Sequence, residues 1–322
     1  MASSLRASIE ELLIHGQLKT LVMGGTRFVG KSLVKILSSK GHDLTLFTRG
    51  LNPVPDNVRH IKGDRKQQSD LKALEGIEFD VVIDTSGREL SDSQMLIDII
   101  GKPSYRFLYL SSAGIYSKSG ILPLDENALI DKESRHIGKS LTENWLTESR
   151  IPFTSFRPTY IYGPGNYNPI ESWFFNRIVN KRPIPIPGNG ETITQLGHVF
   201  DLANAMAITL ETDKTRNSVY NCSGKKAITF NGLVEIAAIA CQVDIDTVEK
   251  VYFDPSSLNP KARKAFPLRL ENFFTDISSL ENDINWIQEF DLQSGFIDSF
   301  KNDYLLTDDL KIDFSSDNKL IS

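Results

Sequence analysis

The segment SRHIGKSLTE, at residues 134–143, carries side chains that suit either proton transfer or anion binding. Lys139 falls on a helix that the pattern predicts over residues 134–149, one turn after Arg135. A tyrosine in place of Arg135 would share a helix face with the lysine, whose charge would lower the phenol pKa and suit it to acid–base work. Arginine has a pKa above about 12 and keeps its proton near neutrality. The segment therefore raises the question whether the chain moves a proton or holds an anion.

Other titratable side chains could take over the proton transfer. His136 titrates in a suitable range. It follows directly after Arg135, however, and neighbouring residues on a helix point about 100° apart, so its ring would point away from the required face. Tyr116, Tyr160 and Tyr162 belong to other predicted elements and would need hydrogen-bond contact with the site. We favour the loss of proton transfer over such a rescue, because general-base work demands that geometry.

Arg135 and Lys139 are expected to repel each other on the predicted helix by a few tenths of a kcal/mol. Glu143, one turn further, could partly neutralise them. Two interpretations stay open: an exposed ladder of charges, or a site in which Lys139 holds a cofactor ribose and Arg135 a phosphate. The planar guanidinium can bind two phosphate oxygens at once, which favours the second interpretation.

A glycine-rich turn, VMGGTRFVGKSLV at residues 22–34, follows a predicted strand and opens a predicted helix. In that context glycines let backbone amides approach a pyrophosphate at a helix N-terminus. Gly24 and Gly30 match the outer glycines of G-x-x-G-x-x-G, but the middle position is Arg27. A cation there opposes the helix dipole by about 0.3–1 kcal/mol, which favours a bound anion over a merely solvated side chain. The predicted dinucleotide-binding residues are Gly24, Gly25, Thr26, Arg27, Phe28 and Gly30.

The end of the second predicted strand indicates which dinucleotide would bind. An acidic residue there suits the ribose hydroxyl of NAD, whereas an arginine accommodates the 2′-phosphate of NADP. The chain has LFTRG, so Arg49 favours NADP over NAD, with a solvated loop arginine as the alternative. Asp64 stands where a carboxylate could contact the adenine, and a solvated loop acid is the equal alternative.

Short apolar strands alternate with helical patterns along the first half of the chain, which predicts parallel βαβ units. The expected fold is α/β, a Rossmann-type doubly wound parallel sheet with a smaller, interleaved C-terminal lobe. We predict an N-terminal helical extension at 1–18, begun by a Ser8–Glu11 capping box, and a dinucleotide-binding domain at 19–163. A ligand-binding lobe at 164–305 and an acidic tail at 306–322 follow.

Composition excludes several classes of protein. The net charge of −5 hides an asymmetry: from residue 271 onward twelve acidic residues oppose three lysines, which leaves +4 on the first 270 residues. A modestly basic body suits anionic ligands without the strongly basic surface of many nucleic-acid binders. Two cysteines, Cys222 and Cys241, are too few for a disulfide framework or a zinc site. The longest apolar runs are too short to span a bilayer, so we expect no membrane partner and a cytoplasmic protein.

The motifs GGTRFVG, YLSSAGIYS, SFRPTYIYGPGN, GHVFDLANAMA and VYNCSG resemble, in this order, the extended short-chain dehydrogenase/reductases. That group includes NAD(P)-dependent nucleotide-sugar epimerases and dehydratases. The resemblance implies that Ser112 and Lys139 match the catalytic serine and lysine, and that Arg135 replaces the catalytic tyrosine. Arg157 and His198 lie within family motifs, as anion or substrate candidates or as packing residues.

GGTRFVG, SRHIGK followed by TE, and QLGHVFDLA together resemble the chloroplast stem-loop RNA-binding proteins and their cyanobacterial relatives. The resemblance implies RNA binding, with RNA cleavage reported for the family, and association with ribosomal or transcription machinery. It also implies the plastid stroma if the source is a photosynthetic eukaryote. The segment KARKAFPLR adds Arg263 and Arg269, which could contact a sugar-nucleotide diphosphate or RNA phosphates, or form a solvated basic loop.

Three functional hypotheses follow. The first is an RNA-binding protein on a catalytically altered dehydrogenase scaffold that retains a nucleotide. The second is an NAD(P)-dependent nucleotide-sugar epimerase, dehydratase or reductase with a relocated acid and base. The third is a partner in a larger homo- or hetero-oligomeric assembly, with the acidic tail as a docking surface. No metal-ligand spacing is visible, so we expect no metal and name no nuclease residues.

Overall fold

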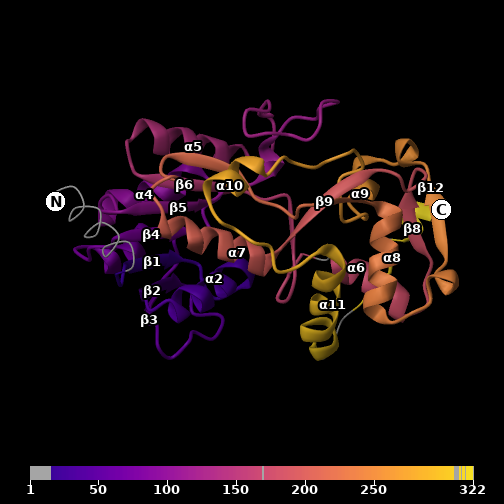
Figure 1. The fold of residues 1–322 in the computed structure, drawn as a ribbon, viewed down its shortest axis with the longest axis horizontal. Coiled ribbons are helices and arrows are strands. Elements are labelled where there is room, and N and C mark those ends of the chain that lie inside the picture. Colours follow the sequence, from indigo (N-terminus) through magenta and orange to yellow (C-terminus); the bar gives the residue numbers. More distant parts are fainter. Residues whose placement is uncertain (1–15, 169, 308–311, 313, 316, 322) are drawn as a thin grey trace.

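The computed structural model describes residues 16–168, 170–307, 312, 314, 315 and 317–321. Two lobes lie side by side along the long axis of the molecule (Figure 1). The predicted N-terminal helix with its Ser8–Glu11 capping box falls on residues 1–15, outside the described residues. In the described part of the chain, no helix has the length and apolar character needed to cross a membrane.

The first lobe is built on a seven-stranded sheet whose neighbouring strands are all parallel, in the order β10-β6-β5-β4-β1-β2-β3. Its strands are β1 Lys19–Met23, β2 Asp43–Thr48, β3 Arg59–Lys62, β4 Val81–Asp84, β5 Arg106–Leu110, β6 Phe153–Arg157 and β10 Ser218–Asn221. The order reverses direction at β1, which places a ligand crevice at the carboxyl ends of β1 and β4. The predicted doubly wound sheet is confirmed.

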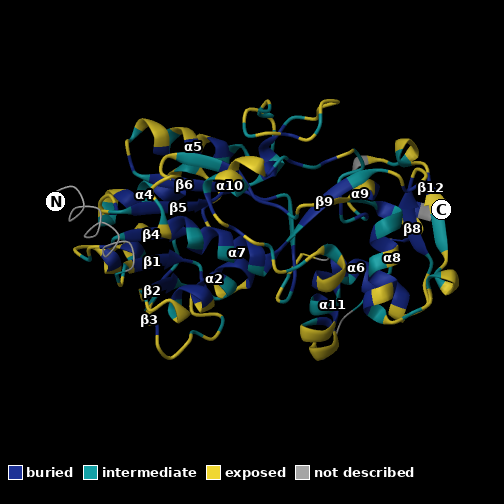
Figure 2. Ribbon diagram, viewed as in Figure 1, coloured by how far each residue is buried: buried dark blue, intermediate teal, exposed yellow. Residues whose placement is uncertain are grey.

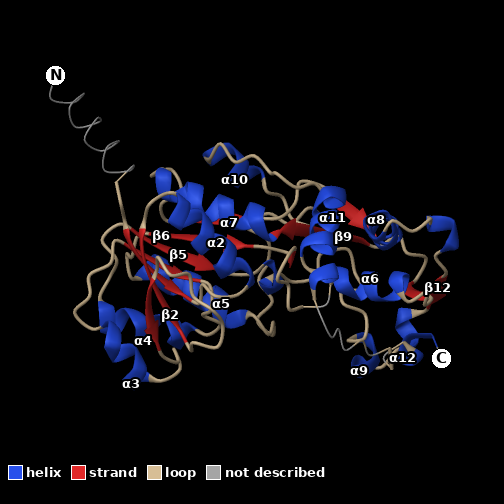
Figure 3. Cartoon of the chain, turned by 90° about the horizontal axis from the view of Figure 1, so that it is seen from below, coloured by secondary structure: helices blue, strands red, loops and turns tan. Residues whose placement is uncertain are grey.

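Helices cover both faces of this sheet (Figure 3). On one face α2, Phe28–Ser39, packs with α7, Val199–Ile208, in an apolar cluster with the sheet. On the other face α4, Leu90–Ile100, and α5, Ile137–Glu148, contribute to a second cluster, beside the short α3, Gln68–Leu71. The inner strands β1, β2, β4, β5 and β6 are almost wholly buried, whereas the edge strand β3 is largely exposed, so the core lies on both faces of the inner part of the sheet (Figure 2).

The C-terminal lobe has two small sheets and a helical layer around an aromatic core. The sheets are formed by β7 Tyr160–Tyr162, β9 Ile193–His198 and β11 Ala227–Thr229, and by β8 Ile184–Pro187 and β12 Lys250–Phe253. The helices of this lobe are α6 Glu171–Val179, α8 Phe230–Cys241, α9 Pro260–Arg263, α11 Leu292–Asn302 and α12 Asn318–Ile321, whereas α10 Ser278–Asp283 lies on the first lobe. This lobe matches the predicted smaller unit.

The two lobes exchange segments. After β7 the chain returns to the first lobe for α7 and β10, and α10 also packs against that core through Leu280. A single boundary at residue 163 is therefore too simple, because segments on its C-terminal side complete the dinucleotide-type domain. The predicted interleaving is what holds the lobes together.

The acidic tail is partly integrated into the C-terminal lobe. Asp317 is buried and forms an ion pair with the buried Arg177, whose guanidinium lies 3.5 Å from the centroid of the Trp173 ring. The helix α12 follows directly. For residues 317–321, packing against the lobe replaces the predicted free docking surface.

Two predicted elements differ in extent. The helix expected over 134–149 starts only at residue 137, because Ser134 Oγ accepts the His136 N–H and donates to the Gly114 carbonyl in a preceding turn. The segment FTSFRPTYIYG at residues 153–163 predicts one strand, but it forms the two strands β6 and β7, which lie in different sheets. Pro158 stands between them and has no N–H for a strand ladder.

Candidate functional site

The glycine turn after β1 has the backbone shape of a pyrophosphate cradle. Gly24 and Gly25 have φ of 109° and 87°, a region that disfavours side chains. A Cβ on Gly30 would lie 2.6 Å from the Gly25 nitrogen, so only glycine lets α2 start directly beneath the turn. Phe28 is buried at the first position of α2 and Thr26 is half-buried before it. The predicted residues of the turn are thus brought together at a helix N-terminus.

Arg27 takes a conformation that neither sequence interpretation included. Its guanidinium lies 4.1 Å from the centroid of the Tyr167 ring, which belongs to the loop after β7. Tyr167 also meets Phe28 edge to face, at 6.0 Å between ring centroids. The arginine therefore ties the glycine turn to the C-terminal lobe, and its stacking leaves the guanidinium edge available to an anion.

Arg49 and Asp64 occupy the positions expected at the adenine end of a dinucleotide. Arg49 is exposed directly after β2. Asp64 follows β3 and is half-buried, with Oδ1 accepting the Lys66 N–H at 2.9 Å. Their contacts with a nucleotide stay predictions.

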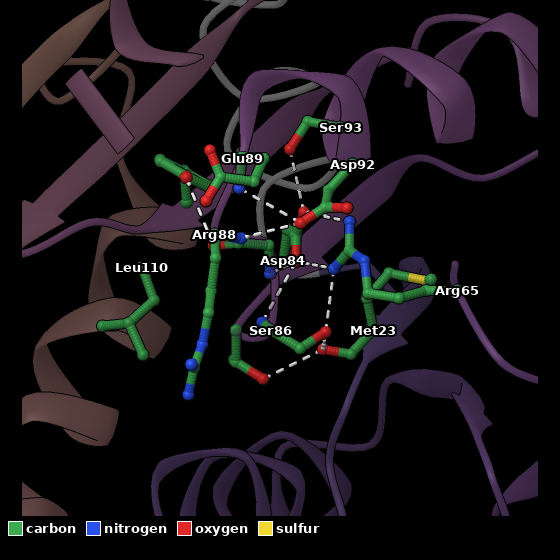
Figure 4. A network of polar contacts seen from close by, with 12 residues as sticks. Met23, Arg65, Asp84, Ser86, Arg88, Glu89, Asp92, Ser93 and Leu110 are labelled. Atoms are coloured by element: carbon green, nitrogen blue, oxygen red, sulfur yellow. Dashed lines mark hydrogen bonds and ion pairs between the residues drawn. The ribbon is translucent and has the colours of Figure 1, made fainter. Parts of the chain in front are cut away.

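A buried ion pair that the sequence reasoning missed closes the carboxyl end of β4 (Figure 4). Asp84 is fully buried and accepts two hydrogen bonds from the Arg65 guanidinium, at 2.5 and 2.9 Å. Ser93 Oγ and the Gly87 N–H donate to the same carboxylate. Burial raises the pKa of Asp84, but Arg65 and the hydrogen bonds outweigh it and bring the pKa below its usual value. The sequence does mark this position, because Asp84 is an acidic residue at the end of an otherwise apolar strand.

Lys139 points into the sheet. Its ammonium donates to the Leu110 carbonyl and lies 5.3 Å from the Tyr109 ring centroid. Burial lowers the pKa of Lys139 to about 8. Ser112, after β5, accepts the Gly114 N–H on its Oγ at 3.0 Å. The serine and lysine that the resemblance predicted therefore both sit at the carboxyl end of β5.

Arg135 does not share a helix face with Lys139, contrary to the sequence prediction. It is exposed in the turn before α5, and its Nε donates to His136 Nε2 at 3.0 Å. Glu143 is not exposed beside them: its carboxylate is buried in an ion pair with Arg157, and it favours the charged form of Lys139 only through its charge. The shared helix face that both interpretations assumed is therefore absent, since the helix begins after Arg135.

The phenols that could have replaced the missing tyrosine all have internal partners. Tyr116 Oη donates to Asn221 and accepts from Arg157, Tyr160 Oη accepts the Arg269 N–H, and Tyr162 Oη donates to the Asp291 carbonyl. Burial raises the pKa of each, that of Tyr116 to about 12. A general acid and base needs the opposite shift, so none of these phenols is prepared for proton transfer.

Arg157 is a structural residue. Its guanidinium binds the Glu143 carboxylate at 2.8 Å, and its remaining donors bind Tyr116 Oη and the Glu126 carbonyl, both at 2.9 Å. Both partners of the ion pair are buried, and Ser155 Oγ also donates to Glu143. All three of its nitrogens are engaged by these buried partners, which favours the packing alternative over an anion site.

His198 also has a packing role. It caps α7 by accepting the Phe200 N–H on Nδ1, and its ring lies 3.9 Å from the Phe290 ring centroid. Burial lowers its pKa, against the opposing effect of Asp298. Arg263 is exposed on α9 in the C-terminal lobe, away from α5 in both views (Figures 1 and 3). Neither residue joins the site at the carboxyl end of the sheet.

Arg269 does reach that site from the C-terminal lobe. It donates to the Gly114 carbonyl at 3.1 Å, and its guanidinium lies 4.2 Å from the Phe273 ring centroid. Burial first, and then the positive charges of Arg135, Lys139, Arg269 and Arg88, lower the pKa of His136 to about 4. The structure thus gathers cations from three separate segments around one neutral imidazole, and Arg88 was missed from the sequence.

Comparisons with known proteins identify the scaffold. Residues 20–223 match the model of the NAD dependent epimerase/dehydratase family. The chain belongs to this family. It is 40% identical, over 94% of its own length and 84% of the relative's, to the "Chloroplast stem-loop binding protein of 41 kDa b, chloroplastic" of Arabidopsis thaliana.

Solved structures share the fold. An epimerase of Methanothermobacter thermautotrophicus superposes with a TM-score of 0.75 and 17% identity, over 92% of this chain and 96% of the other. The UDP-glucose 4-epimerase of Thermus thermophilus, in complex with NAD, superposes with a TM-score of 0.68 and 17% identity, over 87% of this chain and 97% of the other. These likenesses confirm the Rossmann-type architecture.

The residues present fit the dinucleotide that the family name implies. The glycine turn would hold the pyrophosphate, Lys139 would lie at the nicotinamide ribose, and Ser112 would face the substrate oxygen. Bound nicotinamide supplies a hydride acceptor or donor. The described residues contain no group of three His, Cys, Asp or Glu side chains that could hold a metal ion. Cys222, which is buried, and Cys241 form no disulfide in this structure.

Replacing Gly30 by alanine tests the cradle. The added methyl would press on the Gly25 backbone, so we expect at least a tenfold loss of NADH and NADPH binding and a destabilisation of about 1–3 kcal/mol. Gly120→Ala is the matched control, because nothing lies within 4 Å of its Cβ position. Fluorescence titration of both nucleotides measures the loss. Equal binding by the two variants would place the dinucleotide elsewhere.

Proposed function

We propose that this chain is an RNA-binding protein on an epimerase/dehydratase scaffold that keeps a nicotinamide dinucleotide but has lost tyrosine-dependent proton transfer. One observation carries the proposal: Arg135 stands in the tyrosine position, inside a group of cations, while the neighbouring phenols are engaged elsewhere with raised pKa values. The name of the 40% identical relative, a stem-loop binding protein, supports the ligand class.

The cofactor and compartment are part of this proposal. The exposed Arg49 after β2 supports NADP over NAD, because an arginine there suits a 2′-phosphate. The relative is named as chloroplastic, which supports the plastid stroma if the source is a photosynthetic eukaryote. Association with ribosomal or transcription machinery is proposed from the family resemblance alone.

The RNA proposal predicts binding that depends on salt. A stem-loop RNA should shift the protein in a native gel at low salt, and the logarithm of the binding constant should fall linearly with the logarithm of salt concentration. The slope gives the number of phosphates contacted, at about −0.7 to −0.9 per phosphate. A single-stranded RNA of the same composition is the control for recognition of the stem. Absence of binding at low salt by folded protein would refute the proposal, since phosphate contacts are strongest there.

A further inference from the structure

Three arginines without an acidic partner in the described part of the chain converge beside His136. Arg88 follows β4, Arg135 precedes α5 and Arg269 comes from the C-terminal lobe. None of them forms an ion pair with a carboxylate of the described residues. Like charges held together repel, so this group is stabilised when an anion enters it.

Two of the guanidiniums approach the same ring from different lobes. Arg135 Nε donates to His136 Nε2 at 3.0 Å, and Arg269 donates to the Gly114 carbonyl at 3.1 Å. Gly114 packs directly on the imidazole, since a Cβ there would lie 2.6 Å from His136 Cδ2. Arg135 and Arg269 therefore reach the same Gly114–His136 contact, one from each lobe.

Arg88 is placed beside them by the close approach of two helices. Its carbonyl would lie 2.5 Å from a Cβ on Gly138, in the first turn of α5, so only glycine permits the contact. The Arg88 side chain is exposed and extends away from the Asp84 network (Figure 4). Glu89 also borders Gly138 and belongs to the capping box of α4. The cluster thus has three guanidiniums against one bordering carboxylate.

The start of α5 adds a positive end to the cluster. The helix has twelve residues, no acidic residue in its first turn, and an N-cap, His136, without a side-chain capping bond. The first-turn amides of such a helix favour an anion. The ring of His136 is neutral at physiological pH, so it does not repel a cationic neighbour further.

We propose that Arg88, Arg135 and Arg269 bind one phosphate group in front of the first turn of α5. Guanidinium groups suit this ligand because their planar donors can each bind two phosphate oxygens. Lys139 stays behind the site, since its ammonium is held by the Leu110 carbonyl. The phosphate is one of an RNA backbone, an assignment that rests on the proposed function.

Calorimetric titration of the full chain with inorganic phosphate tests the site. Arg135→Gln and Arg269→Gln should each weaken phosphate binding at least tenfold. Arg59→Gln removes the same charge from the exposed start of β3, at the opposite edge of the sheet, and should bind as the wild type does. Equal phosphate binding by all four proteins, or no binding by any, would overturn the site. Arg135 is exposed in a turn, so its variant decides the matter even if Arg269→Gln is unstable.

The RNA assignment has its own readout. Arg135→Gln should reduce the salt slope of stem-loop binding by about one, whereas Arg59→Gln should leave it unchanged. Loss of phosphate binding with an unchanged RNA slope would overturn the RNA assignment and keep the phosphate site. Phosphate binding by a wild type that binds no RNA would instead refute the proposed function. The two failures are therefore distinguishable.

Discussion

Replacing Glu143 by alanine should lower the free energy of unfolding by about 3–5 kcal/mol, because it leaves the Arg157 guanidinium buried without its counter-charge. Both side chains are less than a tenth exposed, and the carboxylate accepts from Arg157 and from Ser155 Oγ. The Tyr116 hydroxyl and one carbonyl would remain as partners and do not neutralise the charge. Chemical denaturation of the two proteins measures the difference.

An exposed ion pair of similar length provides the control. Lys40 and Glu211 meet at 2.5 Å with about a third of each side chain exposed. Glu211→Ala should cost about 0–1 kcal/mol, because solvent screens such a pair and replaces its partner. Similar losses from both substitutions would show that Arg157 reaches solvent when Glu143 is removed, contrary to the structure.

Replacing Asp84 by asparagine should cost about 3 kcal/mol or more and also weaken dinucleotide binding. The amide would present N–H donors to the Arg65 guanidinium, which already donates at 2.5 Å, and the buried arginine would lose its counter-charge. Arg65 directly follows Asp64, the expected adenine contact, and also donates to Ser86 at 2.8 Å. Loss of the pair therefore loosens two walls of the crevice. Denaturation and nucleotide titration measure the two effects.

Asp80→Asn is the matched control for Asp84, since Asp80 lies just before the same strand and its carboxylate accepts from the Lys19 N–H and Ser104 Oγ but from no arginine of the described residues. It should cost about 1 kcal/mol or less. The double variant Asp84→Asn, Arg65→Met should lose about 2 kcal/mol less unfolding free energy than the two single variants lose together. Additive losses would show that the two residues do not interact.

The loss of unfolding free energy caused by Asp84→Asn should also depend on pH. Arg65 and the hydrogen bonds lower the pKa of this carboxyl in the folded state below the usual 3.8. Such a group stabilises the fold above its unfolded-state pKa, and the stabilisation is lost as the pH falls through the folded-state pKa. The difference in the free energy of unfolding between wild type and Asp84→Asn should therefore reach its maximum at neutral pH and decrease below pH 3.8.

The sequence by itself determined the sheet, the glycine cradle and the absence of the proton-transferring tyrosine. These features depend on local rules: period and composition predict strands and helices, and glycine followed by a helical pattern predicts a phosphate turn. The identity of residue 135 needs no structure at all, because no environment lets a guanidinium act as the missing phenol near neutrality.

Only the tertiary structure decided how the charged residues pair. Glu143 and Arg157 are fourteen positions apart and Arg65 and Asp84 nineteen, yet each pair is buried in contact. Arg269 comes 155 positions after Gly114 and binds its carbonyl. Local patterns carry no information about such contacts, which arise when the lobes interleave and desolvate whichever charges meet. That desolvation assigned Arg157 to the core, whereas Arg88, Arg135 and Arg269 have no ion pair with a carboxylate of the described residues.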